Sequence, residues 1–111
     1  MFKISYSPDL RGEVLISGSK NAALPIIAAN YLIDQQIQLE NKPDISDVRS
    51  IEKLAEDALS KSANFFDLTS ELATKFRASI LLIPVGLKKF WEVRFVGSGG
   101  CKIGKRPLDT F

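Results

Sequence analysis

The stretch "GSKNAALPIIAANYLID" (residues 18–34) decides the fold. It begins with a Gly-Ser turn, and the apolar residues that follow surround the helix axis instead of forming one stripe. A helix that is apolar on nearly all sides is typical of a buried helix. Pro25 falls in the first turn, where its missing N–H costs little. The sequence therefore predicts a buried helix with Lys20 and Asn21 at its amino-terminal mouth.

Strands and further helices are predicted on both sides of this helix. A second helix should begin at Ser46 or Asp47, because apolar residues recur at helical spacing from there to Leu59. A third helix is expected from about Ser70 to Phe90, bent before Pro84. A turn is expected at 41–44, and short strands at 2–6, 12–17, 36–41, 63–68 and 91–97. This order predicts a mixed α/β unit within one domain.

The composition excludes several classes of protein. The 111 residues carry 15 Lys+Arg against 13 Asp+Glu, and a net charge of +2 is too balanced for a nucleic-acid binder. A single cysteine provides neither an internal disulfide nor a cysteine-cluster metal site, and it suits a reducing cytosol. The longest apolar stretch, 22–33, is shorter than the ~20 residues that span a bilayer. We expect no cofactor, no metal, no membrane and no nucleic acid.

Lys20 stands where an anion could bind. The amino terminus of a helix presents free N–H groups and a partial positive charge, to which Lys20 would add a full charge. The alternative is that Ser19 simply caps a buried helix and Lys20 is solvated. This segment alone leaves both interpretations open.

Two further stretches carry cations in unusual settings. In "KFRAS" (75–79), Arg77 enters an apolar run, so it either extends to solvent or points into a polar cleft to meet a ligand. In "GSGGCKIGKRPLDTF" (97–111), neighbouring cations favour the thiolate of Cys101, and the Arg106 guanidinium suits a phosphate. The alternative for this closing stretch is a flexible surface loop without a function.

Three motifs in order resemble one family. They are "LRGEVLISGSKNAALPIIAA", "FRAS" and "GGCKIGKRPLD", and they resemble the amino-terminal part of the UDP-N-acetylglucosamine 1-carboxyvinyltransferases, the enolpyruvyl transferases of peptidoglycan synthesis. The resemblance covers essentially the whole chain but only about the opening quarter of the family's usual length. The related 3-phosphoshikimate 1-carboxyvinyltransferases are the alternative, but they usually lack both the "KNAALP" continuation and the Gly-Gly-Cys loop.

The resemblance implies an enzyme that transfers the enolpyruvyl group of phosphoenolpyruvate to the 3′-hydroxyl of UDP-N-acetylglucosamine and releases phosphate. It implies a cytoplasmic, bacterial protein with these two compounds as substrates. Cys101 would be a proton donor or form an adduct with phosphoenolpyruvate, and it would be the residue that fosfomycin-type inhibitors alkylate. The implied catalytic residues are Cys101 and Lys20, and the implied substrate-binding residues are Lys20, Asn21, Arg77, Arg106, Pro107, Asp109 and Thr110.

The resemblance also implies a fold, an inside-out α/β barrel of βαβαββ-like repeats with buried helices and solvent-facing sheets. Residues 1–18 would be strands that pair with a carboxy-terminal domain, and residues 19–111 the first part of the catalytic-loop domain. That partner domain and half of the cleft are expected beyond Phe111, so we expect the isolated chain to be inactive. A non-catalytic fragment that binds UDP-sugar or phosphate and a decayed gene product remain alternatives. The sequence departs from the family at "IPVGL" (83–87) and at Phe111, where a histidine is often found.

Overall fold

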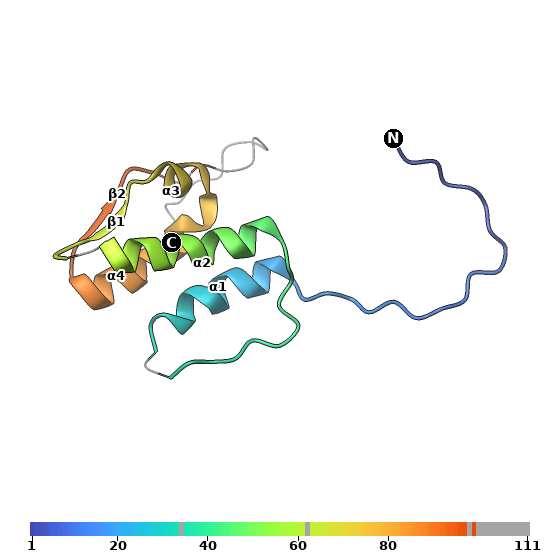
Figure 1. The fold of residues 1–111 in the computed structure, drawn as a ribbon, viewed down its shortest axis with the longest axis horizontal. Coiled ribbons are helices and arrows are strands. Elements are labelled where there is room, and N and C mark those ends of the chain that lie inside the picture. Colours follow the sequence, from blue (N-terminus) through green and yellow to red (C-terminus); the bar gives the residue numbers. More distant parts are fainter. Residues whose placement is uncertain (34, 62, 98, 100–111) are drawn as a thin grey trace.

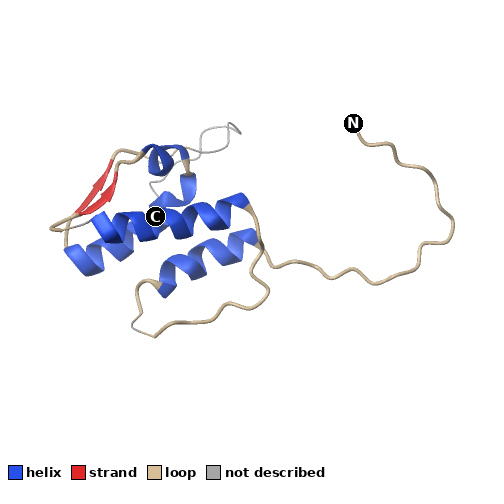
Figure 2. Cartoon of the chain, in the orientation of Figure 1, coloured by secondary structure: helices blue, strands red, loops and turns tan. Residues whose placement is uncertain are grey.

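The fold of the chain combines helices with a small sheet (Figures 1 and 2). The computed structural model describes residues 1–33, 35–61, 63–97 and 99. The elements in chain order are helix α1 (Lys20–Asn30), helix α2 (Ser46–Lys61), strand β1 (Phe66–Leu68), helix α3 (Glu71–Lys75), 3-10 helix η1 (Arg77–Leu82), helix α4 (Ile83–Phe90) and strand β2 (Val93–Phe95). The expectation of a mixed α/β unit is confirmed.

The two strands form a parallel pair. Phe66 lies opposite Val93, and Leu68 lies opposite Phe95. Parallel strands cannot be joined by a tight hairpin, so the chain crosses from β1 to β2 through α3, η1 and α4. The strands predicted within 63–68 and 91–97 are confirmed.

The predicted single helix from about Ser70 to Phe90 is wrong in one respect, because it is divided into three segments. Phe76 has an extended backbone, with φ −104° and ψ 110°, and it separates α3 from η1. The change from η1 to α4 then falls just before Pro84, as expected. Proline lacks an N–H and is tolerated in the first turn of a helix, where Pro84 lies.

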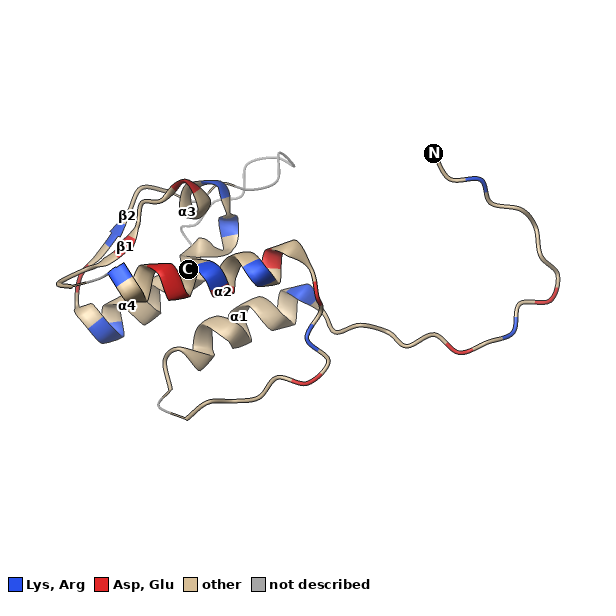
Figure 3. Ribbon diagram, viewed as in Figure 1, with Lys and Arg blue, Asp and Glu red and all other residues tan. Residues whose placement is uncertain are grey.

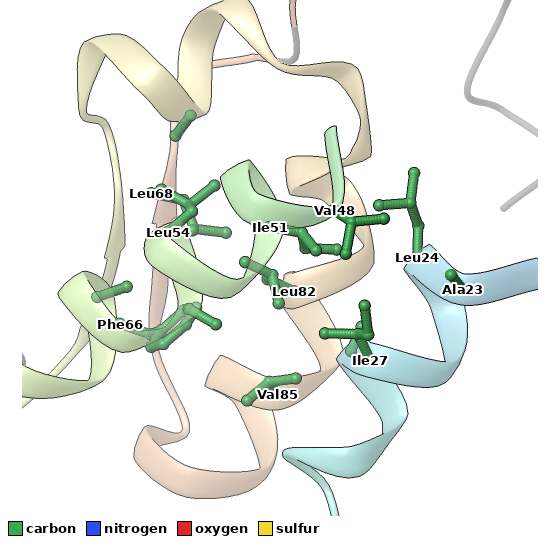
Figure 4. Packing of buried hydrophobic residues seen from close by; sticks show 14 residues of the cluster. Ala23, Leu24, Ile27, Val48, Ile51, Leu54, Phe66, Leu68, Leu82 and Val85 are labelled. Atoms are coloured by element: carbon green, nitrogen blue, oxygen red, sulfur yellow. The ribbon is translucent and has the colours of Figure 1, made fainter. Parts of the chain in front are cut away.

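The core lies between α1, α2, η1, α4 and β1 (Figure 4). Helix α2 contributes one buried stripe, which confirms the periodicity seen in the sequence. From α1, Leu24 and Ile27 point toward Val48 of α2 and Leu82 of η1 (Figure 4). The buried residues of α2 are Val48, Ile51, Leu54, Ala55 and Ala58.

Helix α1 is shorter than predicted and is buried on one side only. Its buried residues include Leu24 and Ile27, whereas Ala22 and Ala29 are exposed and Ile26 is 41% exposed. The prediction of a helix buried on all sides is therefore wrong for the described chain. The physical reason is that α2 and η1 pack against one face of α1, and the described residues supply nothing that covers the opposite face.

The strands predicted at 2–6, 12–17 and 36–41 are not formed within the described residues. Residues 1–17 extend away from the helices as an exposed arm (Figure 1), and the radius of gyration is 17.8 Å, against about 13 Å for a compact chain of this length. A strand needs a ladder of hydrogen bonds to a neighbour, and the described chain provides none along this arm.

Two hydrogen bonds connect the end of the arm to the loop before α2. There the Gly18 N–H donates to the Asn41 carbonyl at 3.1 Å, and Asn41 Nδ2 donates to the Ile16 carbonyl at 3.3 Å. Asn41 has a φ of 52° and lies in a turn, which confirms the turn expected there.

Gly86 allows α4 to approach the sheet closely. A Cβ at this position would lie 2.5 Å from Phe66 Cδ1 and 2.6 Å from Val93 Cγ2. Overpacking costs about 1–3 kcal/mol, and the higher helix propensity of alanine returns about 1 kcal/mol. We therefore expect Gly86→Ala to lower the free energy of unfolding by up to about 2 kcal/mol, measured by denaturant titration. Lys89→Ala, on an exposed site of the same helix, is the control; a stabilised Gly86→Ala variant would contradict this packing.

Candidate functional site

Lys20 lies at the mouth of α1 and is paired with Asp47. It is the first residue of the helix and its only charged residue, so α1 is otherwise uncharged in Figure 3. The distance from Lys20 Nζ to Asp47 Oδ2 is 2.9 Å, and the two side chains are 46% and 38% exposed. Lys20 is thus partly exposed to solvent, as the alternative interpretation expected, but its ammonium also forms an ion pair with a carboxylate.

Ser19 does not cap the helix with its side chain. Its carbonyl accepts a hydrogen bond from the Ala23 N–H at 2.9 Å, but its hydroxyl makes no cap hydrogen bond. Ser19 is therefore the N-cap residue, as the alternative interpretation expected, but its side chain does not contribute a cap hydrogen bond. The first turn of α1 also contains no acidic residue, so its N–H groups face no carboxylate from their own helix.

Two helix amino termini lie at the same end of the molecule. Helices α1 and α2 pack against each other and run in the same direction, so both begin on the side from which the amino-terminal arm leaves (Figure 1). Each contributes partial positive charge, and Lys20 adds a full charge. Asp47 lies in the first turn of α2 and Asn21 is exposed beside Lys20. This end of the helix pair has the electrostatics of an anion site that an internal carboxylate partly neutralises.

Arg77 is half-buried at the start of η1. This 3-10 helix packs against both α1 and α2, so Arg77 belongs to an element in contact with the helix that carries Lys20. Two residues earlier, the backbone of Lys75 lies against Gly99. A Cβ on Gly99 would be 2.5 Å from Lys75 Cα, a separation that only glycine allows without a shift. The start of the closing glycine stretch thus lies against the end of α3.

Several predicted site residues lie outside the described residues. They are Cys101, Arg106, Pro107, Asp109 and Thr110. Sequence reasoning considered Asp47 only as a helix cap and missed its contact with Lys20. No local signal could have revealed it, because the two residues are 27 positions apart in the sequence.

Two of the pockets formed by the described residues border α1 away from Lys20. The larger has a volume of about 590 Å³ and lies between the end of α1, the following loop and α2, with Asn30, Tyr31 and Glu52 in its wall. Burial, followed by the charges of Glu56 and Glu52, raises the pKa of the Tyr31 hydroxyl. The smaller, of about 190 Å³, lies between Gly18 and the loop before α2. Neither pocket is lined by Lys20, Asn21 or Arg77.

The described part of the chain offers neither a membrane-spanning helix nor a metal cluster. Over these residues no helix has the length and apolar character required to cross a membrane. The same residues contain no group of three or more His, Cys, Asp or Glu side chains placed to hold a metal ion.

Comparison with known proteins gives a consistent family. The chain is 37% identical to the UDP-N-acetylglucosamine 1-carboxyvinyltransferase of Helicobacter hepaticus, over 96% of its own length and 29% of the relative's. It is 40% identical to that of Helicobacter pylori and 39% identical to that of Desulforapulum autotrophicum, in each case over 90% of its own length and 27% of the relative's.

The chain thus spans less than a third of the length of the curated relatives it matches. No family model matches it. No solved structure shows significant similarity to it. The resemblance stated from the sequence motifs is nevertheless confirmed: over nearly its whole length, this chain is similar to part of the UDP-N-acetylglucosamine 1-carboxyvinyltransferases.

Proposed function

We propose that this chain is the amino-terminal part of an enzyme that transfers the enolpyruvyl group of phosphoenolpyruvate to the 3′-hydroxyl of UDP-N-acetylglucosamine and releases phosphate. This is the first committed step of peptidoglycan synthesis and takes place in the cytoplasm. One observation carries the proposal. Lys20 lies at the mouth of α1 in a chain that is 37–40% identical, over 90–96% of its length, to proteins named UDP-N-acetylglucosamine 1-carboxyvinyltransferase.

The chemistry is an addition followed by an elimination. The sugar hydroxyl loses its proton to a base as its oxygen bonds to C2 of phosphoenolpyruvate, and C3 gains a proton. C3 then loses a proton as the bond from C2 to the phosphate oxygen breaks, which restores the double bond and releases phosphate. The substrate is an anion throughout, so fixed positive groups provide the main stabilisation. In this proposal Lys20 holds the phosphate or carboxylate of phosphoenolpyruvate and Asn21 hydrogen-bonds the sugar nucleotide. Arg77 and Arg106 engage phosphates.

The closing stretch supplies the remaining groups in this proposal. Cys101 gives the proton to C3 or holds phosphoenolpyruvate as a covalent adduct, and it is the thiol that a fosfomycin-type inhibitor alkylates. Pro107, Asp109 and Thr110 lie near the uridine. The contact between Gly99 and the Lys75 backbone supports this arrangement, because it brings the beginning of the stretch close to the element that begins with Arg77.

The proposed domain organisation follows the same family. Residues 1–18 pair with a carboxy-terminal domain, and residues 19–111 begin the catalytic-loop domain of an inside-out α/β barrel. Two observations support it. Phe2, Ile4 and Tyr6 alternate along the arm and are at least 92% exposed, as expected of strands that lack their partner. The exposed apolar face of α1 is likewise suited to further packing.

The test is phosphate release by the longer protein that contains this segment. Release should require phosphoenolpyruvate and UDP-N-acetylglucosamine together, and the isolated chain should release none. Release with shikimate 3-phosphate in place of the sugar nucleotide would assign the related enolpyruvyl transferase instead. Binding of the sugar nucleotide without any release by the longer protein would leave only a binding function.

A further inference from the structure

We propose that Asp47 positions Lys20 for the substrate anion, an inference that rests on the proposed function. The contact that carries it is the 2.9 Å approach of Lys20 Nζ to Asp47 Oδ2. Asp47 is a positioning residue in this proposal: it touches Lys20 and acts on the substrate only through that side chain.

Both partners are attached to rigid parts of the fold. Asp47 precedes Val48, which is 1% exposed, and the next turn of α2 contains Ile51, which is fully buried. Lys20 begins the helix that packs on α2, and Leu24 of this helix points toward Val48 (Figure 4). The backbone that carries the Asp47 carboxylate is therefore held in place. The packing of α1 on α2 determines where the Lys20 ammonium lies relative to it.

The ammonium keeps its capacity to bind a substrate while Asp47 holds it. A lysine ammonium has three N–H donors and no acceptor, so one bond to Asp47 leaves two for oxygens of a phosphate or carboxylate. Without this bond, the flexible four-carbon stem of Lys20 would sample many rotamers. Asp47 selects one of them before the substrate arrives, which lowers the entropy lost on binding.

The location of the pair separates it from ordinary surface ion pairs. Asp44–Arg49 and Glu71–Lys75 join residues that are five and four positions apart, and exposed pairs of that kind contribute little. Lys20–Asp47 instead joins the first turns of two helices whose amino termini lie at one end of the molecule. At that end the Asp47 carboxylate lies against Lys20 and beside the helix termini, and a bound substrate anion would share the same positive region.

The test is the steady-state kinetics of the longer protein that contains this segment. Asp47→Asn should lower kcat/KM for phosphoenolpyruvate about tenfold, within the range by which a misplaced catalytic group slows a reaction, and the KM for UDP-N-acetylglucosamine should stay within about twofold. Asp47→Glu should recover part of the loss, since it restores the charge. Asp44→Asn, which removes a carboxylate of the same segment that pairs with Arg49, is the matched control and should behave as wild type.

A double-mutant cycle decides whether Asp47 acts through Lys20. In a Lys20→Ala background, Asp47→Asn should cause no further loss, and an equal loss in both backgrounds would overturn the inference. A higher kcat/KM for phosphoenolpyruvate in Asp47→Asn than in the wild type would overturn it too, because Asp47 would then compete with the substrate for Lys20. If the wild type is active and Asp47→Asn has the same kcat/KM for phosphoenolpyruvate, this inference fails but the proposed function stands. A wild type that releases no phosphate would defeat the proposed function and, with it, the role of Asp47.

Discussion

Phe66→Ala should lower the free energy of unfolding by about 3–5 kcal/mol, the cost of removing a large aromatic side chain from a core. Phe66 is fully buried, its ring stacks on that of Phe90 with centroids 5.8 Å apart, and it lies directly under Gly86 of α4. A domain of this size has only about 5–15 kcal/mol of stability in total. Denaturant titration followed by circular dichroism should therefore show a much earlier transition, or no folded baseline at all.

The neighbouring phenylalanine provides the control for this substitution. Phe65 is only partly buried, and the Arg94 guanidinium lies 3.5 Å from its ring centroid. Because an exposed cation–π contact contributes about 0.5–1 kcal/mol, Phe65→Ala should cost much less than Phe66→Ala. Similar losses at the two positions would contradict the burial of Phe66 in the core and the partial exposure of Phe65.

Lys20→Ala should lower kcat/KM for phosphoenolpyruvate by about 10²–10³-fold in the longer protein, the usual effect of removing one preorganised group that stabilises developing charge. The substitution should leave the melting temperature nearly unchanged, because the ion pair with Asp47 is half exposed and such pairs contribute little to stability. Phosphate release under varied phosphoenolpyruvate is the measurement.

Lys53→Ala is the matched control for Lys20→Ala. Lys53 is exposed on α2, so its removal changes the net charge equally without touching the mouth of α1. A loss of less than about threefold for Lys20→Ala, or an equal loss for both variants, would place the substrate anion elsewhere and remove the basis of the proposed function.

Local signals were sufficient to predict part of the fold. The stripe of Val48, Ile51 and Leu54 identified α2 because helical periodicity depends on residues three and four positions apart. The strands around Phe66 and Val93 were likewise visible as short runs of strand-forming residues. The interruption at Phe76 was missed, because the pattern from Ser70 onward contains no proline or glycine before Pro84.

The rest of the fold depends on contacts between distant segments. The arm at 1–17 and the segment at 36–41 have strand composition, but no strand of the described chain pairs with them to form a ladder. The apolar residues of α1 similarly indicate burial without saying which neighbour provides it. Composition predicts what a segment can bury, whereas the neighbours determine what it does bury.

The candidate site divides in the same way. Lys20 and Arg77 could be singled out from their surroundings in the sequence, but Asp47 acquires its meaning only from the packing of α1 on α2. The roles of Cys101, Arg106, Pro107, Asp109 and Thr110 stay predictions from the family motif, since these residues lie outside the described part of the chain.

The exposed arm has a consequence for handling the isolated chain. Proteases cleave extended backbone that can enter their active-site clefts, and residues 1–17 have that form up to the hydrogen bond between Gly18 and Asn41. Digestion should therefore trim the amino terminus first. The helices and the β1–β2 pair would survive as a resistant product whose new end lies close to Lys20.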